Sequence, residues 1–359
     1  QGQIINRGSS NTMRLRPFVE NILVLGQSHL ANAVTEEMRK RRRYRILDLM
    51  EPGEPGRVFK DGVPFVGSLD RGLRTIPRTH RIVVALSERR GRLPIEALLD
   101  AKRQGVAIED AVHLYERLTG KLALDQLQPS YLIFAPELGR RSLHTILLRL
   151  FSVLLAAAGL VICAPLLAVI ALLIKWDSAG PIFFLHERIG KDGRKFSLVK
   201  FRTMDSVVPS KSEWVRDNGH RITAVGRWLR KYRLDELPQL FNVVMGHMNL
   251  IGPRPHPASN YHLFMRNIPF YTFRATVRPG ITGWAQVRYG YANDLQEEIE
   301  KMQYDMYYIK YHSLRLDVEI IVRTIGVIIL GSESPRIGAI LKEKSVSKDE
   351  SRFDEQSAA

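Results

Sequence analysis

Two adjacent carboxylates, Asp235 and Glu236, are the side chains of this sequence best placed to do chemistry, and Pro238 follows them closely. Proline is tolerated in the first turn of a helix, where the amide donors have no partner. We therefore expect a helix to begin here, with Asp235 near its N-cap and Glu236 in its first turn. Such a position favours anions, and two carboxylates there can hold Mg²⁺ together with phosphate oxygens. An acidic pair is also common in helix capping, so the pair alone does not distinguish a metal and phosphate site from a helix cap.

Cationic side chains that stand beside apolar or rigid residues change that balance. Arg254 has a proline on each side, and a proline follows Arg278, so the backbone is restrained at both positions. A guanidinium held in place suits bidentate binding of phosphate. Several such groups around an acidic pair indicate a diphosphate substrate with Mg²⁺. The candidate substrate-binding cations are Arg188, Lys200, Arg202, Arg230, Arg254 and Arg278.

The composition limits the class of protein. The chain has 359 residues, which predicts two domains, and its 45% hydrophobic and 25% charged residues are ordinary for a folded protein. Wholesale disorder, a collagen and a polytopic membrane bundle are therefore excluded. The single cysteine, Cys163, excludes a disulfide framework and a cysteine-built zinc site. The formal net charge of +16 indicates an anionic partner: nucleic acid, anionic lipid or a phosphorylated substrate.

One segment is long and apolar enough to reach into a membrane. Phe151–Ile174 has 24 residues without a charge, and basic residues stand on both sides of it. Pro165 inside this run removes a helix hydrogen bond and introduces a kink. A helix that breaks and leaves on the face by which it entered explains both the proline and the two basic flanks. A kinked single span and a buried core helix are the alternatives.

The first residues lack the apolar core of a signal peptide, and we expect residues 1–16 to be a flexible segment. A chain that opens with Gln1 resembles a trimmed or mature fragment, so we expect a further segment upstream. Short apolar runs then alternate with helical patterns, which predicts parallel strands joined by helices. The sequence thus predicts a Rossmann-like domain over residues 17–135. Its expected strands are 21–26, 44–49, 81–86 and 106–109, and its helices are 28–43 and 94–105.

The loop after the first strand is a poor match to a dinucleotide fingerprint, which needs three glycines. Gly26 is present, but Ser28 and Ala31 occupy the other two positions, and Ser28 would obstruct the approach of a pyrophosphate. Asp48 lies about where a ribose-binding acid would stand. We expect a regulatory or dimerising domain without a ligand, with nucleotide binding as the alternative.

The rest of the chain does not show this alternation of strands and helices. We expect an amphipathic lead-in and the membrane helix over residues 136–178, and a mostly α-helical catalytic module with short strands over residues 179–335. Leu314–Leu330 has an apolar stripe typical of an interfacial helix, although a core helix fits equally well. Residues 336–359 are polar and charged and predict a mostly disordered tail. The predicted fold class is α/β.

Several motifs between about Arg149 and Ser334 resemble the bacterial sugar transferase family, the monotopic polyprenyl-phosphate phosphoglycosyl transferases. As a whole, the chain is similar to the larger branch that initiates exopolysaccharide synthesis, in which a membrane bundle and a Rossmann-like domain precede the catalytic module. The matching stretches, in the family's order, are Arg188–Gly190, Lys200–Met204, Leu234–Asn242, Gly252–Pro255, Arg278–Val287 and Tyr304–Lys310.

The resemblance implies a covalent mechanism. Asp235 would attack the β-phosphorus of a UDP-sugar and expel UMP, and a polyprenyl phosphate such as undecaprenyl phosphate would then take the sugar-phosphate from Asp235. Glu236 lies about 100° round a helix from Asp235, which favours a metal ligand or proton handler over a second nucleophile. Asp305 matches a family acidic position and would assist, with a helix-surface acid as the alternative. Mg²⁺ is the implied cofactor.

The resemblance also implies where the protein works. It implies a re-entrant helix broken at Ala164–Pro165, contact with anionic lipid, and a catalytic module on the cytoplasmic face of the bacterial inner membrane. We expect a homodimer and no nucleic-acid partner. The expected sugar is glucose, with galactose second.

Two other classes of protein compete with this interpretation. A nucleotide-sugar dehydrogenase or dehydratase needs an intact glycine fingerprint and, in its commonest form, a Tyr-x-x-x-Lys motif. Tyr307 and Tyr308 lie too close to Lys310 for that spacing. A membrane scaffold or basic nucleic-acid binder would release no UMP when mixed with a UDP-sugar and lipid phosphate.

Overall fold

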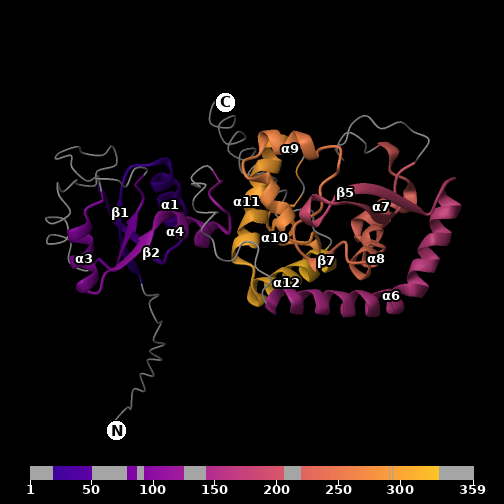
Figure 1. The fold of residues 1–359 in the computed structure, drawn as a ribbon, viewed down its shortest axis with the longest axis horizontal. Coiled ribbons are helices and arrows are strands. Elements are labelled where there is room, and N and C mark those ends of the chain that lie inside the picture. Colours follow the sequence, from indigo (N-terminus) through magenta and orange to yellow (C-terminus); the bar gives the residue numbers. More distant parts are fainter. Residues whose placement is uncertain are drawn as a thin grey trace, which may run out of the picture. The chain divides into compact units, whose positions relative to one another are not determined.

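The computed structural model describes residues 19–50, 79–86, 93–124, 143–205, 220–290, 292 and 294–330. The expected flexible segment 1–16 and the expected tail 336–359 lie outside these residues, as does the side chain of Asp48. The chain divides into two compact units, residues 1–120 and 121–359, which are followed along the colour scale of Figure 1.

The first unit is built on a four-stranded parallel sheet in the order β2-β1-β3-β4. The four expected strands and their parallel pairing are thus confirmed. Ile22, Leu23 and Val24 of β1 are fully buried, as expected for a strand whose sheet is covered on both faces. The elements are β1 (Glu20–Leu25), α1 (His29–Arg39), β2 (Tyr44–Met50), β3 (Arg81–Val84), α3 (Ile95–Arg103), β4 (Ala107–Asp110) and α4 (Ala111–Thr119).

In the loop between β1 and α1, the backbone turns at Gly26 and the side chain of Ser28 bonds to the neighbouring main chain. Gly26 has a φ of +116°, and a Cβ there would lie 2.7 Å from the carbonyl oxygen of Ala85, so glycine is required. Ser28 is the N-cap of α1: its Oγ accepts from the amide of Ala31 at 3.1 Å and donates to the carbonyl of Ala85 at 2.7 Å. The serine that breaks the glycine fingerprint therefore satisfies the helix start.

The boundary between the units differs from the expected end of the first domain at residue 135. Leu122 and Leu124 lie in one hydrophobic cluster with Phe264 and Met306, and the amide of Leu122 donates to the carbonyl of Gln303 at 2.9 Å. These contacts place residues 121–124 in the second unit. Residues 125–142 lie outside the described part of the chain.

The second unit begins with α6 (Leu143–Asp177), a 35-residue helix with Pro165 in its interior. In Figure 1 this helix runs along the lower edge of the unit and then turns sharply upward. Within the described residues it is the one helix long and apolar enough to cross a membrane. A proline inside a helix is a usual cause of such a bend. The structure thus confirms the kink that the sequence predicts.

The parts of α6 before and after Pro165 each bury one narrow face and expose the rest. Ala156 lies in a cluster with Val243, whereas Ile170 and Ile174 lie in another with Phe201 and Leu229. The outer face is apolar and open, with several side chains more than half exposed. These side chains include Leu143, Ile146, Leu154, Val161, Ile162 and Leu172.

The remainder of the second unit is mostly helical with short strands, as expected. Its first strands form an antiparallel hairpin, β5 (Phe183–Ile189) with β6 (Lys195–Phe201), and β7 (Asn249–Ile251) pairs in parallel with β8 (Gly280–Thr282). The helices are α7 (Ala224–Lys231), α8 (Gln239–Val244), α9 (Tyr261–Asn267), α10 (Trp284–Arg288), α11 (Leu295–Tyr311) and α12 (Leu314–Leu330), and the 3₁₀ turns include Leu234–Glu236 and Tyr271–Thr276.

Helix α12 combines the two interpretations that its sequence allows. Leu316 and Ile320 are buried in a core cluster, so one face of the helix is a core face. The opposite side carries apolar residues that are at least half exposed, namely Leu314, Val318, Val322 and Ile325.

Candidate active site

The acidic pair lies in a 3₁₀ turn that precedes α8. The amides of Glu236 and Leu237 donate to the carbonyls three residues earlier, those of Arg233 and Leu234. Arg233 is the N-cap of this turn and has a left-handed φ of +57°, and Pro238 is the N-cap of α8. Asp235 and Glu236 both lie in the first turn, two and three residues after the N-cap Arg233, so the expected position of the pair near a helix start is confirmed. The start is a tighter 3₁₀ turn and not the expected α-helical one.

Asp235 is a buried carboxylate, and one of its oxygens has no hydrogen-bond partner among the described residues. Its side chain is 7% exposed, and its Oδ1 makes no hydrogen bond to any described residue. Burial and the neighbouring charge of Glu236 raise the pKa of Asp235, while Lys200, Arg230 and Arg254 oppose that rise. A buried acceptor without a donor is costly, so this oxygen is held ready for a ligand or a reaction.

Glu236 is held by cations on three sides. Arg254 binds it with both terminal nitrogens, Nη2 to Oε1 at 2.6 Å and Nη1 to Oε2 at 3.2 Å. Lys200 Nζ lies 3.3 Å and Arg233 Nη1 3.7 Å from the same Oε1. Burial alone would raise the pKa of Glu236, but Arg254, Lys200 and Arg233 together hold it well below its usual range. Glu236 is therefore ionised and fixed.

Lys200 comes from β6 and approaches the pair from the hairpin. Burial lowers the pKa of Lys200 to about 8, although the charge of Glu236 favours the ammonium. Arg230, on α7, donates from Nε to Thr203 Oγ1 at 3.0 Å and is close enough to Asp235 to lower its pKa. The structure thus gathers Lys200, Arg230 and Arg254 around the acidic pair, as the sequence predicts.

The segment that carries Arg254 is held from several sides. A Cβ at Gly280 would lie 2.2 Å from the amide nitrogen of Gly252, so β7 and β8 can pair this closely only without side chains there. Arg188 donates from Nη1 to the carbonyl of Pro255 at 2.9 Å and contacts His186 Nδ1 at 3.0 Å. Arg188 therefore supports the segment of Arg254, and direct substrate binding by Arg188 stays a prediction.

Two predicted cations donate to backbone carbonyls at helix ends. Arg202 donates from Nη2 to the carbonyl of Ser178 at 2.6 Å and to that of Ile174 at 3.3 Å, at the C-terminus of α6. Arg278 donates from Nε to the carbonyl of Gly246 at 3.2 Å, just past α8. Their part in substrate binding stays a prediction.

Asp305 is no surface acid, so that alternative is wrong. The carboxylate is 1% exposed, and its Oδ2 lies 2.8 Å from both Nε and Nη2 of Arg274. Burial raises the pKa of Asp305 while Arg274 and Lys301 oppose the rise. The same Nη2 of Arg274 donates to the backbone carbonyl of Arg254. Asp305 therefore reaches the acidic pair through Arg274 and Arg254.

A buried polar network lies beside this chain of contacts, and sequence reasoning missed it. His256 lies 2.5 Å from Glu298 and 2.8 Å from the hydroxyl of Tyr271, and Lys301 Nζ lies 3.0 Å from Glu298. Burial, with the charge of Arg274, lowers the pKa of His256 to about 3. The charges at positions 298, 301 and 305 share one face of α11, and that spacing was the available signal.

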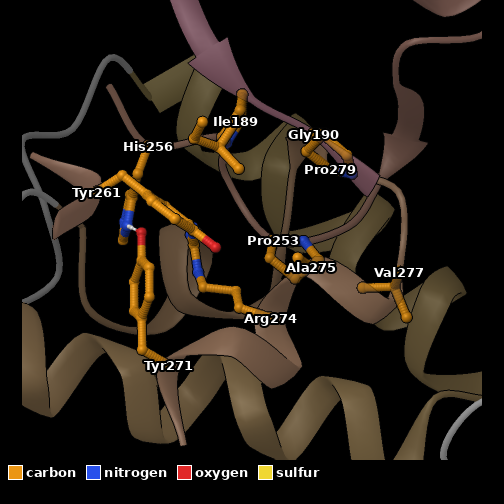
Figure 2. A pocket seen from close by; sticks show the side chains of 11 residues that line it. Ile189, Gly190, Pro253, His256, Tyr261, Tyr271, Arg274, Ala275, Val277 and Pro279 are labelled. Carbon is orange, nitrogen blue, oxygen red and sulfur yellow. Dashed lines mark hydrogen bonds between the residues drawn. The ribbon is translucent and has the colours of Figure 1, made fainter. Parts of the chain in front are cut away.

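A small cavity opens next to this network. Figure 2 shows Arg274, Tyr261 and Tyr271 on one side of it and Ile189 and Gly190 on the other. A dashed line in the figure joins His256 to Tyr271. Pro253 and Pro255, which flank Arg254, also line the cavity. The cavity is therefore next to the segment that carries this arginine.

The residues of the acidic pair differ in their fitness for a metal ion. No group of three or more His, Cys, Asp or Glu side chains gathers among the described residues. Oδ1 of Asp235 fits a metal, because it is an oxygen donor without a partner. Glu236 fits only if it gives up a contact to Lys200 or Arg254. Any Mg²⁺ here must therefore take most of its ligands from substrate and water.

The comparison with protein families agrees with the expected motifs. A family model described as bacterial sugar transferase matches residues 143–331, which is more than half of the chain and contains every site residue named above.

Curated relatives match this chain over a length similar to that of the family model. The chain is 42% identical over 217 residues to a protein of Aeromonas hydrophila named UDP-N-acetylgalactosamine-undecaprenyl-phosphate N-acetylgalactosaminephosphotransferase, covering 60% of this chain and 51% of that protein. It is 42% identical over 185 residues to a UDP-glucose:undecaprenyl-phosphate glucose-1-phosphate transferase of Xanthomonas campestris pv. campestris, covering 50% of this chain and 38% of that one. The chain thus spans about half the length of these relatives, or less.

A third relative is short. An exopolysaccharide production protein of Rhizobium leguminosarum bv. phaseoli is 37% identical over 188 residues, which cover 50% of this chain but 94% of that protein. Half of the present chain therefore corresponds to nearly all of this relative.

Proposed function

This chain belongs to the bacterial sugar transferase family, and we propose that it transfers a sugar-1-phosphate from a UDP-sugar to undecaprenyl phosphate. The observation that carries the proposal is the buried Oδ1 of Asp235, which has no partner among the described residues and lies beside the cluster formed by Lys200, Arg254 and Glu236. A nucleophile needs a free oxygen, and a diphosphate needs cations next to it. The names of the relatives support the substrates.

In the first step we propose that Asp235 attacks the β-phosphorus of the UDP-sugar. A bond forms between a carboxylate oxygen and that phosphorus, and the bond to the bridging oxygen breaks, so UMP leaves with the bridging oxygen. The product is an acyl phosphate that joins Asp235 to the sugar-1-phosphate. The raised pKa of Asp235 makes its carboxylate a better nucleophile, and the nearby cations keep it ionised enough to react.

In the second step an oxygen of undecaprenyl phosphate attacks the same phosphorus. The bond to Asp235 breaks, which restores the carboxylate and gives a polyprenyl diphosphate-sugar. Lys200 and Arg254 would stabilise the charge on the phosphoryl oxygens in both steps, because Glu236 already fixes them next to Asp235. Two successive displacements at one site give ping-pong kinetics.

We extend the proposal to Mg²⁺ as cofactor. Asp235 would hold it through the carboxylate oxygen that does not attack, with Glu236 as a second ligand once a cation contact is released. When bound, the ion neutralises charge on the diphosphate.

The proposed acceptor is a lipid, so the site must face a membrane. We propose that α6 is re-entrant, with its break at Ala164–Pro165, and that the unit sits on the cytoplasmic face of the bacterial inner membrane, where UDP-sugars are found. The bend of α6 and its open apolar face support this placement (Figure 1). Basic residues at both ends of the apolar run would contact anionic lipid.

The first unit would serve assembly or regulation. We propose that it supports a homodimer and that it is dispensable for chemistry. The filled loop at Ser28 and the short relative, which half of this chain nearly covers, support this role.

The test is UMP release from a panel of UDP-sugars by the full chain with undecaprenyl phosphate in lipid nanodiscs. We propose glucose first and galactose second, and the Aeromonas relative adds N-acetylgalactosamine to the panel. Release that needs one UDP-sugar supports the proposal and names the sugar. No release with any UDP-sugar, by protein that is folded, contradicts it.

A further inference from the structure

We propose that Arg274 is a positioning residue for the reaction: held by Asp305, it fixes the main chain at Arg254 and thereby the cation that grips Glu236. The inference rests on the proposed function and adds to it a residue that lies outside the acidic pair and its direct partners.

The first link is a buried ion pair. Nε and Nη2 of Arg274 both lie 2.8 Å from Oδ2 of Asp305, and both side chains are nearly inaccessible, at 8% and 1% exposure. Burying two charges is expensive, and a buried pair is weak evidence for a purely stabilising role. Such a pair is better explained by the second bond that Nη2 of the arginine makes.

The second link joins this pair to the backbone. Nη2 of Arg274 also donates to the carbonyl oxygen of Arg254. That carbonyl lies between Pro253 and Pro255, whose rings restrict the backbone on both sides. A backbone with so little freedom passes a shift of its carbonyl on to the side chain.

The third link reaches the acidic pair. Arg254 binds both oxygens of Glu236 in a forked contact, which tolerates little displacement. A misplacement of about 1 Å in an active site costs roughly 100-fold in rate. Arg274 thus acts on the reaction through Arg254.

An alternative role is direct substrate binding, because Arg274 also lines the cavity of Figure 2. The two roles predict different kinetics. A positioning residue changes kcat and leaves the KM for the UDP-sugar close to its original value, whereas a binding residue raises KM.

The experiment is a double-mutant cycle in the full chain in nanodiscs, with UMP release as the assay. We expect Arg274→Met to lower kcat roughly 100-fold with KM within about 3-fold. Arg254→Met should lower kcat at least as much, and the double variant should be no slower than Arg254→Met alone, because Arg274 has nothing left to position. Multiplicative losses, or a loss confined to KM, would overturn the inference.

Two further variants keep the test sound. Arg274→Met with Asp305→Asn removes both buried charges and guards against unfolding, and it should show the same loss of kcat. Tyr289→Phe is the matched control, because Tyr289 is equally buried and donates to Glu300, outside residues 252–257, and its kcat should fall far less than that of Arg274→Met.

A measurement independent of turnover separates this inference from the proposed function. Amide hydrogen exchange of residues 252–257 should be faster in Arg274→Met than in the original protein and unchanged in Tyr289→Phe. Faster exchange in a protein that releases no UMP would support the positioning contact and contradict the function. Unchanged exchange in an active enzyme would contradict the positioning contact alone.

Discussion

Replacement of Lys200 by methionine should make the protein more stable and less active. Burial lowers the pKa of Lys200 from 10.5 to about 8, so the folded state disfavours its charge relative to the unfolded state. Between these two values the unfolded chain holds a proton that the folded chain has released, so stability rises as pH rises. The difference between these two pKa values corresponds to about 3 kcal/mol. At pH 7 the charged Lys200 lowers the free energy of unfolding by this amount.

Lys200→Met removes that penalty. We expect it to raise the free energy of unfolding at pH 7 by up to about 3 kcal/mol, a difference that already includes the favourable charge of Glu236. The rise of stability between pH 8 and 10.5 should disappear in the variant. Turnover should fall by roughly 100-fold or more, because a charge that stabilises the phosphoryl oxygens is lost.

The assay is urea unfolding in detergent with EDTA, followed by tryptophan fluorescence at pH 7, 8.5 and 10. All four tryptophans belong to the second unit, so the signal reports that unit alone. Lys195→Met is the matched control, because Lys195 lies on the same strand in an exposed pair with Glu187 at 3.0 Å. Its stability should change by less than about 0.5 kcal/mol. If Lys200→Met lowers stability at pH 7 and keeps the pH slope of the original protein, the reasoning is refuted.

Three other predictions follow from the same account. Excess EDTA should abolish turnover and added Mg²⁺ should restore it, and undiminished turnover in EDTA would contradict the metal proposal. Deletion of residues 1–120 should retain UMP release and lower the mass of the oligomer by light scattering, whereas complete loss of activity in a folded truncation would place the first unit in the site. In a Cys163→Ser background, cysteines introduced at Ser142 and Asp192 should react with an impermeant reagent from the same side of the membrane, and labelling from opposite sides would mean that α6 spans.

The sequence was most informative where local rules decide. Short apolar runs alternating with helical patterns predicted the four parallel strands of the first unit, and the proline in the apolar run predicted the kink of α6. The sequence predicted cations around the acidic pair as phosphate binders, but not the ion pairs of Glu236 with Lys200 and Arg254, which are 18 to 36 positions away. No periodicity links residues that far apart.

The sequence failed where tertiary contacts decide. Arg202 and Arg278 lie in matching family motifs as Arg254 does, yet both donate to carbonyls at helix ends. The turn at Asp235 is 3₁₀ and not α-helical, because its hydrogen bonds join residues three apart and not four apart, and residue types do not distinguish the two. Arg274 lies 31 residues from Asp305, so their buried pair could be found only in three dimensions.

The most direct test of the central claim is covalent labelling of the protein by a UDP-sugar that carries radioactive β-phosphate, without any lipid acceptor. The account predicts one label per active site in the original protein, release of one UMP per label, and transfer of the label to undecaprenyl phosphate when this is added. Asp235→Asn should take up no label and release no UMP. Label on Asp235→Asn at the original level, or UMP release by the original protein only after the acceptor is added, would contradict a nucleophilic Asp235.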